Sequence, residues 1–280
     1  MRNFEILAQG CFSSAQVEIS YQSEWRMPRT SDLEAWMDTL WEAKLTEARA
    51  QGKRLFDAPL FRLVGAESTL DNKLMLRLGD TSYKEYVTTR EDSFARKHSR
   101  EELGNAIGVC SVVETSDNYI LLDKRQGVDA YEGHYHVIGG FFERGLDMDE
   151  RLPDPFAAIC REIREETGIQ AEDIHSQYCL GAAYDMLMPH GELLFLTHLN
   201  IPLAEVLQRE PEEDEIKELK TLHVSEASLK NFLLEHHGHI SPTGEPNLLL
   251  YGALRYGQDW LIPILHHIEA QTLDLSAHES

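Results

Sequence analysis

The chain has 280 residues, of which 42% are hydrophobic and 26% charged, a composition typical of a globular protein with one large domain or two modest ones. No apolar run has the length of a membrane span, and the first residues lack the basic start and apolar core of a signal peptide. The formal net charge is −22, and residues 106–280 contribute −20 of it, with 11 Lys and Arg against 31 Asp and Glu. Such a field repels nucleic acid and anionic membranes, so neither is expected as a partner. The four cysteines have no CxxC or metal-ligand spacing, which predicts structural thiols in a reducing cytoplasm.

Residues 1–104 are predicted to form a smaller N-terminal α+β domain. Alternating apolar and polar residues predict a strand at 16–21. Ser31-Asp32 are expected to cap a helix that ends near residue 51 and carries an apolar stripe at helical spacing. Two strands at 60–64 and 73–78, joined by a polar turn, are expected next, followed by a helix over 81–95.

Residues 105–280 are predicted to form a second domain, a mixed sheet flanked by helices. Strands at 107–113 and 119–123 are expected to pair, and a short strand at 134–138 leads into the turn Gly139-Gly140. The remaining predicted elements are strands at 178–185, 191–201 and 219–224, a helix capped by Ser225 that ends near 235, and helices at 247–256 and 259–270. The predicted fold class is therefore α/β.

The most informative stretch is a helix predicted to begin after Asp154-Pro155 and to end before Gly168. Aspartate is a good N-cap, proline suits the first helical position, and glycine suits the position after the last turn.

Three carboxylates lie on one face of this helix, Glu162, Glu165 and Glu166. Residues three and four apart on a helix are surface neighbours, so the three side chains can converge. Converging carboxylates repel one another unless a cation lies between them, and a hard divalent cation prefers oxygen ligands. The pattern therefore predicts a site for Mg²⁺, with Mn²⁺ as the alternative ion. The alternative interpretation is a charged helix surface without a metal.

The strand, glycine turn, capped helix and carboxylates together resemble the Nudix box of hydrolases that cleave nucleoside diphosphates linked to another group. The resemblance implies an α/β/α sandwich, metal-binding or catalytic roles for Glu162, Glu165 and Glu166, and an orienting role for Arg161. The first half of the motif departs from the family pattern. The glutamate expected six residues after Gly140 is Leu146, and residues 148–153 form an insertion. Asp147 and Glu143 are the candidates to replace the missing acid.

Segments 41–45, 55–63 and 76–84, with Ser241-Pro242 and residues 249–251, resemble Nudix hydrolases of UDP-glucose and UDP-galactose. That resemblance implies Mg²⁺-dependent hydrolysis of a UDP-sugar to UMP and a sugar 1-phosphate, with a small nucleotide as the partner. Another Nudix substrate, such as ADP-ribose or a dinucleoside polyphosphate, and a non-catalytic nucleotide sensor stay open. The oligomeric state is open as well, a homodimer included.

Several residues outside the helix are candidates for substrate contact. Arg62 and Tyr83 lie in the segments that resemble the UDP-sugar enzymes, and a tyrosine can stack on uracil or pack in the core. Lys124 and Arg125 follow a predicted strand and either bind phosphate or lie exposed on the surface.

Two further features concern the chemistry. The Gly139-Gly140 turn lets backbone groups approach a metal or a phosphate closely. Glu215, in an acidic stretch before the last predicted strand, is the candidate general base, with a solvated acidic loop as the alternative.

Overall fold

The computed structural model describes residues 3–126, 130–149, 152–212, 216 and 218–278, with side chains up to residue 270. Its strands are β1 Phe4–Phe12, β2 Val17–Tyr21, β3 Pro59–Ser68, β4 Leu74–Ser82, β5 Ile107–Glu114, β6 Tyr119–Lys124, β7 Tyr135–His136, β8 Ile138–Phe141, β9 Met148–Asp149, β10 Leu152–Pro153, β11 Ile174–Asp185, β12 His190–Leu199 and β13 Leu219–His223. Its α-helices are α1 Ser31–Ala50, α2 Tyr83–Thr89, α3 Asp92–Ala95, α4 Pro155–Thr167, α5 Leu203–Val206, α6 Glu226–His236, α7 Gly244–Tyr256 and α8 Gln258–His278.

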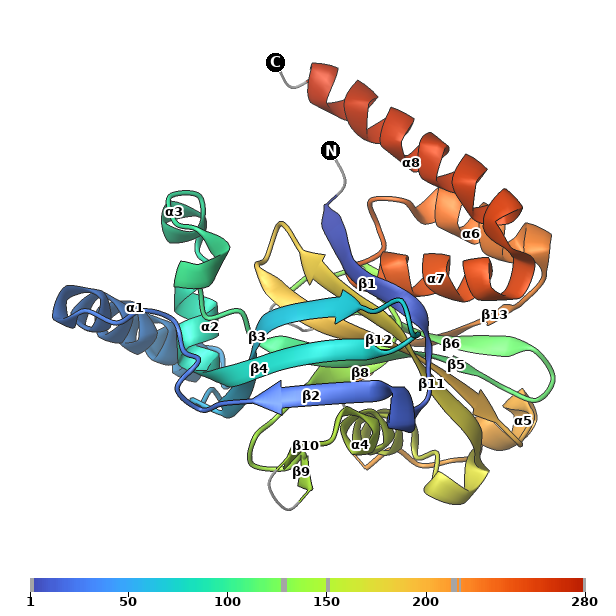
Figure 1. Cartoon of the computed structure of the whole chain (residues 1–280), viewed down its shortest axis with the longest axis horizontal. Coiled ribbons are helices and arrows are strands. Elements are labelled where there is room, and N and C mark those ends of the chain that lie inside the picture. The colour runs from blue at the N-terminus through green and yellow to red at the C-terminus, as the bar shows by residue number, and fades with distance from the viewer. Residues whose placement is uncertain (1–2, 127–129, 150–151, 213–215, 217, 279–280) are drawn as a thin grey trace.

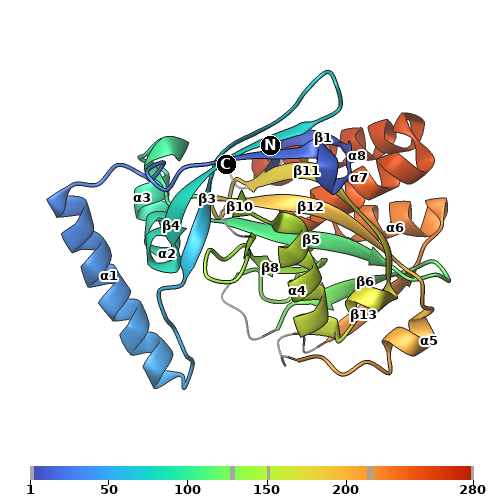
Figure 2. The ribbon, with the colours of Figure 1, turned by 60° about the horizontal axis from the view of Figure 1, so that its bottom comes forward.

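The main sheet has eight strands within the described residues (Figure 1). Six follow the order β1-β11-β12-β5-β6-β13, while β7 pairs with β6 and β8 pairs with β5. The β12–β5 pairing is parallel and the others are antiparallel. Helix α4 packs on β8 and β5, and α7 packs on the sheet together with α6 and α8. Figure 2 shows α4 on one face of the sheet and α6, α7 and α8 on the other. The predicted α/β sandwich with a mixed central sheet is confirmed.

A second sheet, in the order β2-β4-β3, lies beside the main one. Its strand β3 is tied to the main sheet by main-chain hydrogen bonds from Phe61 N to Phe142 O (3.1 Å) and from Leu63 N to Asn105 O (2.9 Å). Helices α1, α2 and α3 accompany this smaller sheet, and α1 extends away from the body of the molecule (Figures 1 and 2). The domain boundary at 104/105 stays a prediction, and β1, which precedes it, lies in the main sheet.

Strand β1 is absent from the predicted elements. It pairs with β11 with register shifts between Ile6 and Ala8 and between Gln9 and Phe12. These irregularities break the alternation of buried and exposed residues on which the sequence prediction depends. Two helix predictions were also inaccurate. The N-cap of α1 is Thr30, whose hydroxyl accepts from Leu33 N at 3.2 Å, and the helix predicted over 81–95 is divided into α2 and α3.

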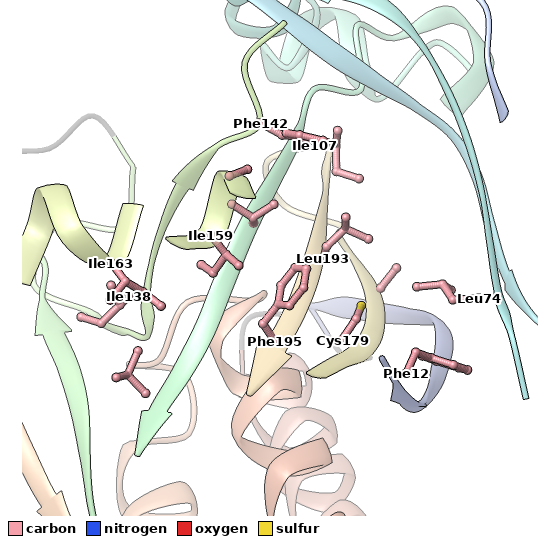
Figure 3. Close-up of a cluster of buried hydrophobic side chains, with 14 of the residues drawn as sticks. Phe12, Leu74, Ile107, Ile138, Phe142, Ile159, Ile163, Cys179, Leu193 and Phe195 are labelled. Atoms are coloured by element: carbon pink, nitrogen blue, oxygen red, sulfur yellow. The ribbon is translucent and has the colours of Figure 1, made fainter. Parts of the chain in front are cut away.

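Three clusters of buried hydrophobic residues lie within the described part of the chain, and two of them hold these layers together. The first lies between the two sheets and α4, and Figure 3 shows Leu74 of β4, Ile159 of α4 and Phe195 of β12 within it. The second lies between the main sheet and helices α6, α7 and α8. Each fully buried large aliphatic or aromatic side chain contributes about 1.5–3 kcal/mol. The main sheet is therefore a rigid support for side chains at its edges.

Within the described part of the chain, none of the helices combines the length and apolar character that a bilayer crossing requires.

Candidate functional site

Helix α4 begins and ends as its sequence signals predict. The Asp154 Oδ1 atom accepts hydrogen bonds from Phe156 N and Ala157 N, both at 3.0 Å. Gly168 has φ 73°, and its N–H donates to Arg164 O at 2.8 Å. These caps satisfy backbone groups that a helix end leaves unpaired, and they set the position of the helix against β8.

Arg161 lies between the carboxylates of α4. Its Nη1 atom is 2.9 Å from Glu162 Oε1 and 2.8 Å from Glu165 Oε2. Burial would lower the pKa of Arg161, but hydrogen bonds and charges from the surrounding carboxylates raise it above its ordinary value, so the guanidinium stays charged. The positive charge compensates two carboxylates that would otherwise repel each other.

Asp147 holds the other side of Arg161. Its Oδ1 accepts from Arg161 Nε at 2.9 Å, and its Oδ2 accepts from Arg161 Nη2 at 2.8 Å and from Glu143 N at 2.8 Å. The Asp147 side chain is buried, whereas Leu146 is 61% exposed. Of the two candidates for the missing acid, Asp147 is therefore the one whose carboxylate pairs with the arginine. Within the insertion, β9 and β10 pair with each other in antiparallel fashion.

The glycines of β8 let the α4 carboxylates approach the main chain. Gly139 N donates to Glu166 Oε2 at 3.1 Å. A Cβ atom on Gly140 would lie 2.5 Å from Glu162 Oε2, which is closer than atoms can pack. Together with Glu165, these side chains offer carboxylate oxygens, the donors that Mg²⁺ or Mn²⁺ prefers. The residues present therefore fit a divalent ion.

A cavity of about 370 Å³ lies beside the glycine strand. Its lining consists of Tyr83, Tyr86, Arg90, Gly108, Arg125, Ala130, Tyr131, His136, Gly139, Gly140, Phe141, His190, Glu192, Ser241 and Thr243. One wall is aromatic. The Phe141 ring is 5.6 Å from the Tyr83 ring and 5.7 Å from the Tyr86 ring, both edge-to-face. The guanidinium of Arg90 lies 4.7 Å above the Tyr86 ring.

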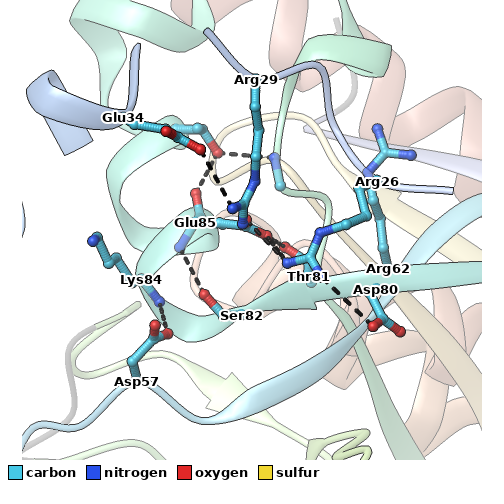
Figure 4. A network of polar contacts seen from close by, with 12 residues as sticks. Arg26, Arg29, Glu34, Asp57, Arg62, Asp80, Thr81, Ser82, Lys84 and Glu85 are labelled. Carbon is cyan, nitrogen blue, oxygen red and sulfur yellow. Dashed lines mark hydrogen bonds and ion pairs between the residues drawn. The ribbon is translucent and has the colours of Figure 1, made fainter. Parts of the chain in front are cut away.

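A buried polar network fixes α2, which supplies two of these rings (Figure 4). Glu85 is only 2% exposed. Its carboxylate accepts from Thr81 Oγ1 at 3.0 Å and from Arg26 Nη2 at 3.2 Å, and it also pairs with Arg29. A buried carboxylate with several donors resists displacement because unpaired burial of its charge is costly. Helix α2 is thereby held in place, so the aromatic wall is preformed.

The polar part of the lining centres on the buried Glu192. His136 Nε2 lies 3.5 Å from Glu192 Oε1, and His190 Nε2 lies 3.8 Å from Glu192 Oε2. Burial would raise the pKa of Glu192, but His136 and His190 hold it well below its usual range. Burial disfavours the imidazolium of His190, whereas contacts with Tyr86, Glu192 and Asp185 raise its pKa to about 10. His136 lies on β7, whereas His190 and Glu192 lie on β12. No motif joins the two strands, and the sequence analysis missed these residues.

The predicted substrate residues are only partly brought together. Tyr83, Arg125, Gly139 and Gly140 line the cavity. Lys124 lies elsewhere, with its Nζ atom 4.0 Å above the Tyr135 ring. Arg62 is buried, and its Nη2 atom donates to Glu101 O at 2.8 Å and to Leu103 O at 3.2 Å. The predicted general base, Glu215, is among the residues that the structure does not describe.

The family model for the NUDIX domain matches residues 102–243, about half of the chain. Among curated proteins, none matches the chain. Among solved structures, the chain is similar to a bifunctional NMN adenylyltransferase/ADP ribose pyrophosphatase from Francisella tularensis, with 16% identity and a TM-score of 0.40. That match covers 61% of this chain and 46% of that protein, so the chain spans less than half of its length.

Two further structures are similar at the same low level. The MutT protein from Methanosarcina mazei has 17% identity and a TM-score of 0.35, with 54% of this chain and 94% of that one covered. The NUDIX domain of Shewanella oneidensis NrtR, solved with ADP ribose, has 17% identity and a TM-score of 0.29, with 45% and 92% covered. The family assignment therefore depends on the family model.

Proposed function

Because the chain belongs to the NUDIX domain family of pyrophosphatases, we propose that it hydrolyses the pyrophosphate bond of a nucleoside diphosphate sugar. The preferred substrate is UDP-glucose or UDP-galactose, with UMP and the sugar 1-phosphate as products. The observation that carries the proposal is the cavity beside β8. It combines an aromatic wall with two guanidinium groups, and its glycine strand contacts the carboxylates of α4.

The chemistry of the cavity lining supports a nucleotide conjugate. Aromatic side chains such as Tyr83 and Tyr86 provide faces and edges against which a base can pack. Arg90 and Arg125 bring positive charge to a chain of net charge −22, where a free pyrophosphate would otherwise be repelled. A cavity of about 370 Å³ falls within the size range of small-molecule sites.

The segments that resemble the UDP-sugar enzymes contribute Tyr83 and Ser241 to the lining of this cavity. Residues 55–63 contain the start of β3, and residues 76–84 contain the end of β4 and the first turn of α2, including Tyr83. The choice of a UDP-sugar over other nucleotide conjugates therefore follows from the sequence resemblance, and Tyr83 and Ser241 connect that resemblance to the cavity.

In the proposed reaction, water attacks one phosphorus of the pyrophosphate, the bridging P–O bond breaks, and the proton of the attacking water is released. Glu162, Glu165 and Glu166 would hold a divalent ion that neutralises the phosphate charge and lowers the pKa of a bound water. Arg161 keeps the carboxylates in position, and Arg125 neutralises charge on the phosphates. A small nucleotide substrate and a reducing cytoplasmic compartment are part of the same proposal.

The proposal is tested with a panel of nucleotide conjugates in Mg²⁺. UDP-glucose or UDP-galactose is expected to have at least about tenfold higher kcat/KM than ADP-ribose or a dinucleoside polyphosphate, a difference of about 1.4 kcal/mol in transition-state binding. Faster turnover of ADP-ribose would contradict the sugar-nucleotide assignment and leave the pyrophosphatase assignment intact.

A second experiment separates catalysis from mere binding. Glu165→Gln is expected to lower kcat by roughly 100-fold or more, since metal-assisted charge stabilisation contributes several kcal/mol. Glu172→Gln, at an exposed glutamate outside α4, is the matched control and should retain the parent rate. If neither the parent nor Glu165→Gln hydrolyses any conjugate while both bind nucleotide, the sensor function is correct instead.

A further inference from the structure

Cys110, His136 and Glu192 come together beside the cavity, which His136 and Glu192 line. One donor atom from each, the thiol sulfur, an imidazole nitrogen and a carboxylate oxygen, all lie within 4.8 Å of one another. Among the described residues, this is the group of three possible metal ligands whose donor atoms lie within that distance of one another. The donor atoms of the three α4 glutamates are farther apart. All three side chains are buried, at 0%, 5% and 4% exposure. Each comes from a different strand, β5, β7 and β12, so the sheet itself holds them together.

The spacing is that of ligands around a small cation. His136 Nε2 and Glu192 Oε1 are 3.5 Å apart. This separation is longer than an ordinary N–H···O hydrogen bond, which spans about 2.7–3.2 Å between the two heavy atoms. Zinc binds nitrogen and oxygen at about 2.0–2.2 Å, so two such ligands at the tetrahedral angle lie about 3.4 Å apart. The observed separation therefore matches an edge of a tetrahedron. Zn–S bonds are about 2.3 Å long, so a bound Cys110 sulfur would lie about 3.5 Å from the other two ligand atoms. The observed donor atoms lie within 4.8 Å of one another.

Outer contacts hold two of the three side chains in the orientation that ligation needs. His136 Nδ1 lies 2.5 Å from Ser241 Oγ, which also accepts from Gly244 N at 3.1 Å. With Nδ1 engaged by the hydroxyl, Nε2 is the nitrogen that faces Glu192. Asn247 is fully buried, and its Nδ2 lies 3.4 Å from the Cys110 sulfur, where an amide N–H favours a thiolate. The Asn247 Oδ1 atom has no hydrogen-bond partner.

The charges and the open side of the cluster also suit an ion. When an ion binds, the Cys110 thiol would release its proton, and the thiolate and the Glu192 carboxylate would together balance the two charges of the cation. His136 and Glu192 line the cavity, which leaves a fourth position accessible to water or to a ligand. Mixed sulfur, nitrogen and oxygen ligands select a borderline-soft transition metal rather than Mg²⁺.

We propose that Cys110, His136 and Glu192 form a binding site for a transition metal of the Zn²⁺ class, separate from the carboxylates of α4. The inference does not depend on the proposed substrate. The site has three protein ligands on three strands and one coordination position open to the cavity. Ser241 is a positioning residue, since it acts on the ion through His136.

The test uses Co²⁺ as the probe on the full chain, stripped of metal and supplied with excess Mg²⁺. Cobalt bound to a thiolate has a charge-transfer absorption in the near ultraviolet that cobalt bound only to carboxylates lacks. We expect one equivalent of Co²⁺ with this absorption in the parent protein and competition by Zn²⁺. Absence of the thiolate absorption in the parent, at saturating cobalt, overturns the proposal without any variant.

Variants assign the ligands. Cys110→Ser should abolish the thiolate absorption, whereas Cys160→Ser, at a half-buried thiol on α4, should retain it. Glu165→Gln should also retain it, because that carboxylate belongs to the other site. A thiolate absorption that survives in Cys110→Ser refutes the assignment.

Two further variants keep the thiol and guard against a folding defect in Cys110→Ser. Glu192→Gln should retain the absorption at saturation but raise the Kd for Co²⁺ at least tenfold. Ser241→Ala should raise it by roughly 10- to 100-fold, the range seen when a residue that orients a ligand is removed. Unchanged cobalt affinity in a folded Glu192→Gln variant, checked by circular dichroism, means that the carboxylate is not a ligand and overturns the site.

Discussion

Asp147→Asn tests the inference that the residue after Leu146 supplies the acid that the Nudix motif places elsewhere. The Asp147 carboxylate accepts two hydrogen bonds from Arg161 and one from Glu143 N, all between 2.8 and 2.9 Å. The asparagine amide keeps one acceptor oxygen and replaces the other by a donor. At least one N–H group of Arg161 or of the main chain then faces an N–H group instead of an oxygen.

The size of the effect follows from these contacts. Hydrogen bonds to charged groups contribute about 1.5–3 kcal/mol each, and Asp147 is buried, so the free energy of unfolding should fall by about 2–4 kcal/mol. For a chain of this length that corresponds to a decrease in Tm of about 4–8 °C. Arg161 also separates Glu162 from Glu165, so its displacement should lower kcat by roughly 10- to 100-fold.

The assay combines urea unfolding with initial rates on UDP-glucose. Leu146→Ala is the matched control, since this side chain is 61% exposed and should change the free energy of unfolding by less than about 0.5 kcal/mol. Leu146→Glu, introduced into Asp147→Asn, should not restore activity, because position 146 faces solvent. The reasoning is refuted if Asp147→Asn matches the parent in both stability and rate, or if Leu146→Ala loses as much.

Three further outcomes are expected. Gly140→Ala should lower kcat at least about tenfold with little loss of stability, because the added Cβ would lie 2.5 Å from a carboxylate oxygen of α4 that can rotate away; an unchanged rate would mean that this carboxylate is not used. Tyr83→Ala should raise KM by roughly tenfold, since an aromatic contact to a base contributes about 1–3 kcal/mol and this ring is partly exposed in the cavity lining; a change in kcat alone would contradict a binding role. Burial raises the pKa of Glu114, but its contacts with His198 and Arg255 outweigh burial and hold the pKa below its ordinary value. The stability that this carboxylate contributes should therefore be present above pH of about 4.3 and lost as the pH falls through the folded pKa. In urea unfolding the difference between the parent and Glu114→Gln should shrink between about pH 5 and pH 3, whereas a difference that grows would contradict this sign.

Much of the fold could be predicted because its signals are local. Asp154, Pro155 and Gly168 mark the ends of α4, and the structure has the helix at Pro155–Thr167. Ser225 caps α6 as expected, accepting from Ser228 N at 3.1 Å. Such signals act over a single turn of chain, so neighbouring residues are sufficient to specify them.

Other parts of the fold depend on pairing with distant strands. Strand β1 is irregular by itself and is recognisable only through its register with β11. Arg62 illustrates the same limit for a side chain, since its segment suggested substrate contact, whereas its guanidinium donates to the main chain of Glu101 and Leu103.

The candidate site divides in the same way. Helical spacing was enough to group Glu162, Glu165 and Glu166, because residues three and four apart on a helix are neighbours in space, and the resemblance to the Nudix box added Arg161 to the group. The meeting of Cys110, His136 and Glu192 has no such signal. These residues are distant in sequence, and it is the hydrogen-bond register between strands that brings them together. A shift of one residue in any of these strands would turn the side chain to the opposite face of the sheet, so tertiary packing alone decides whether the cluster exists.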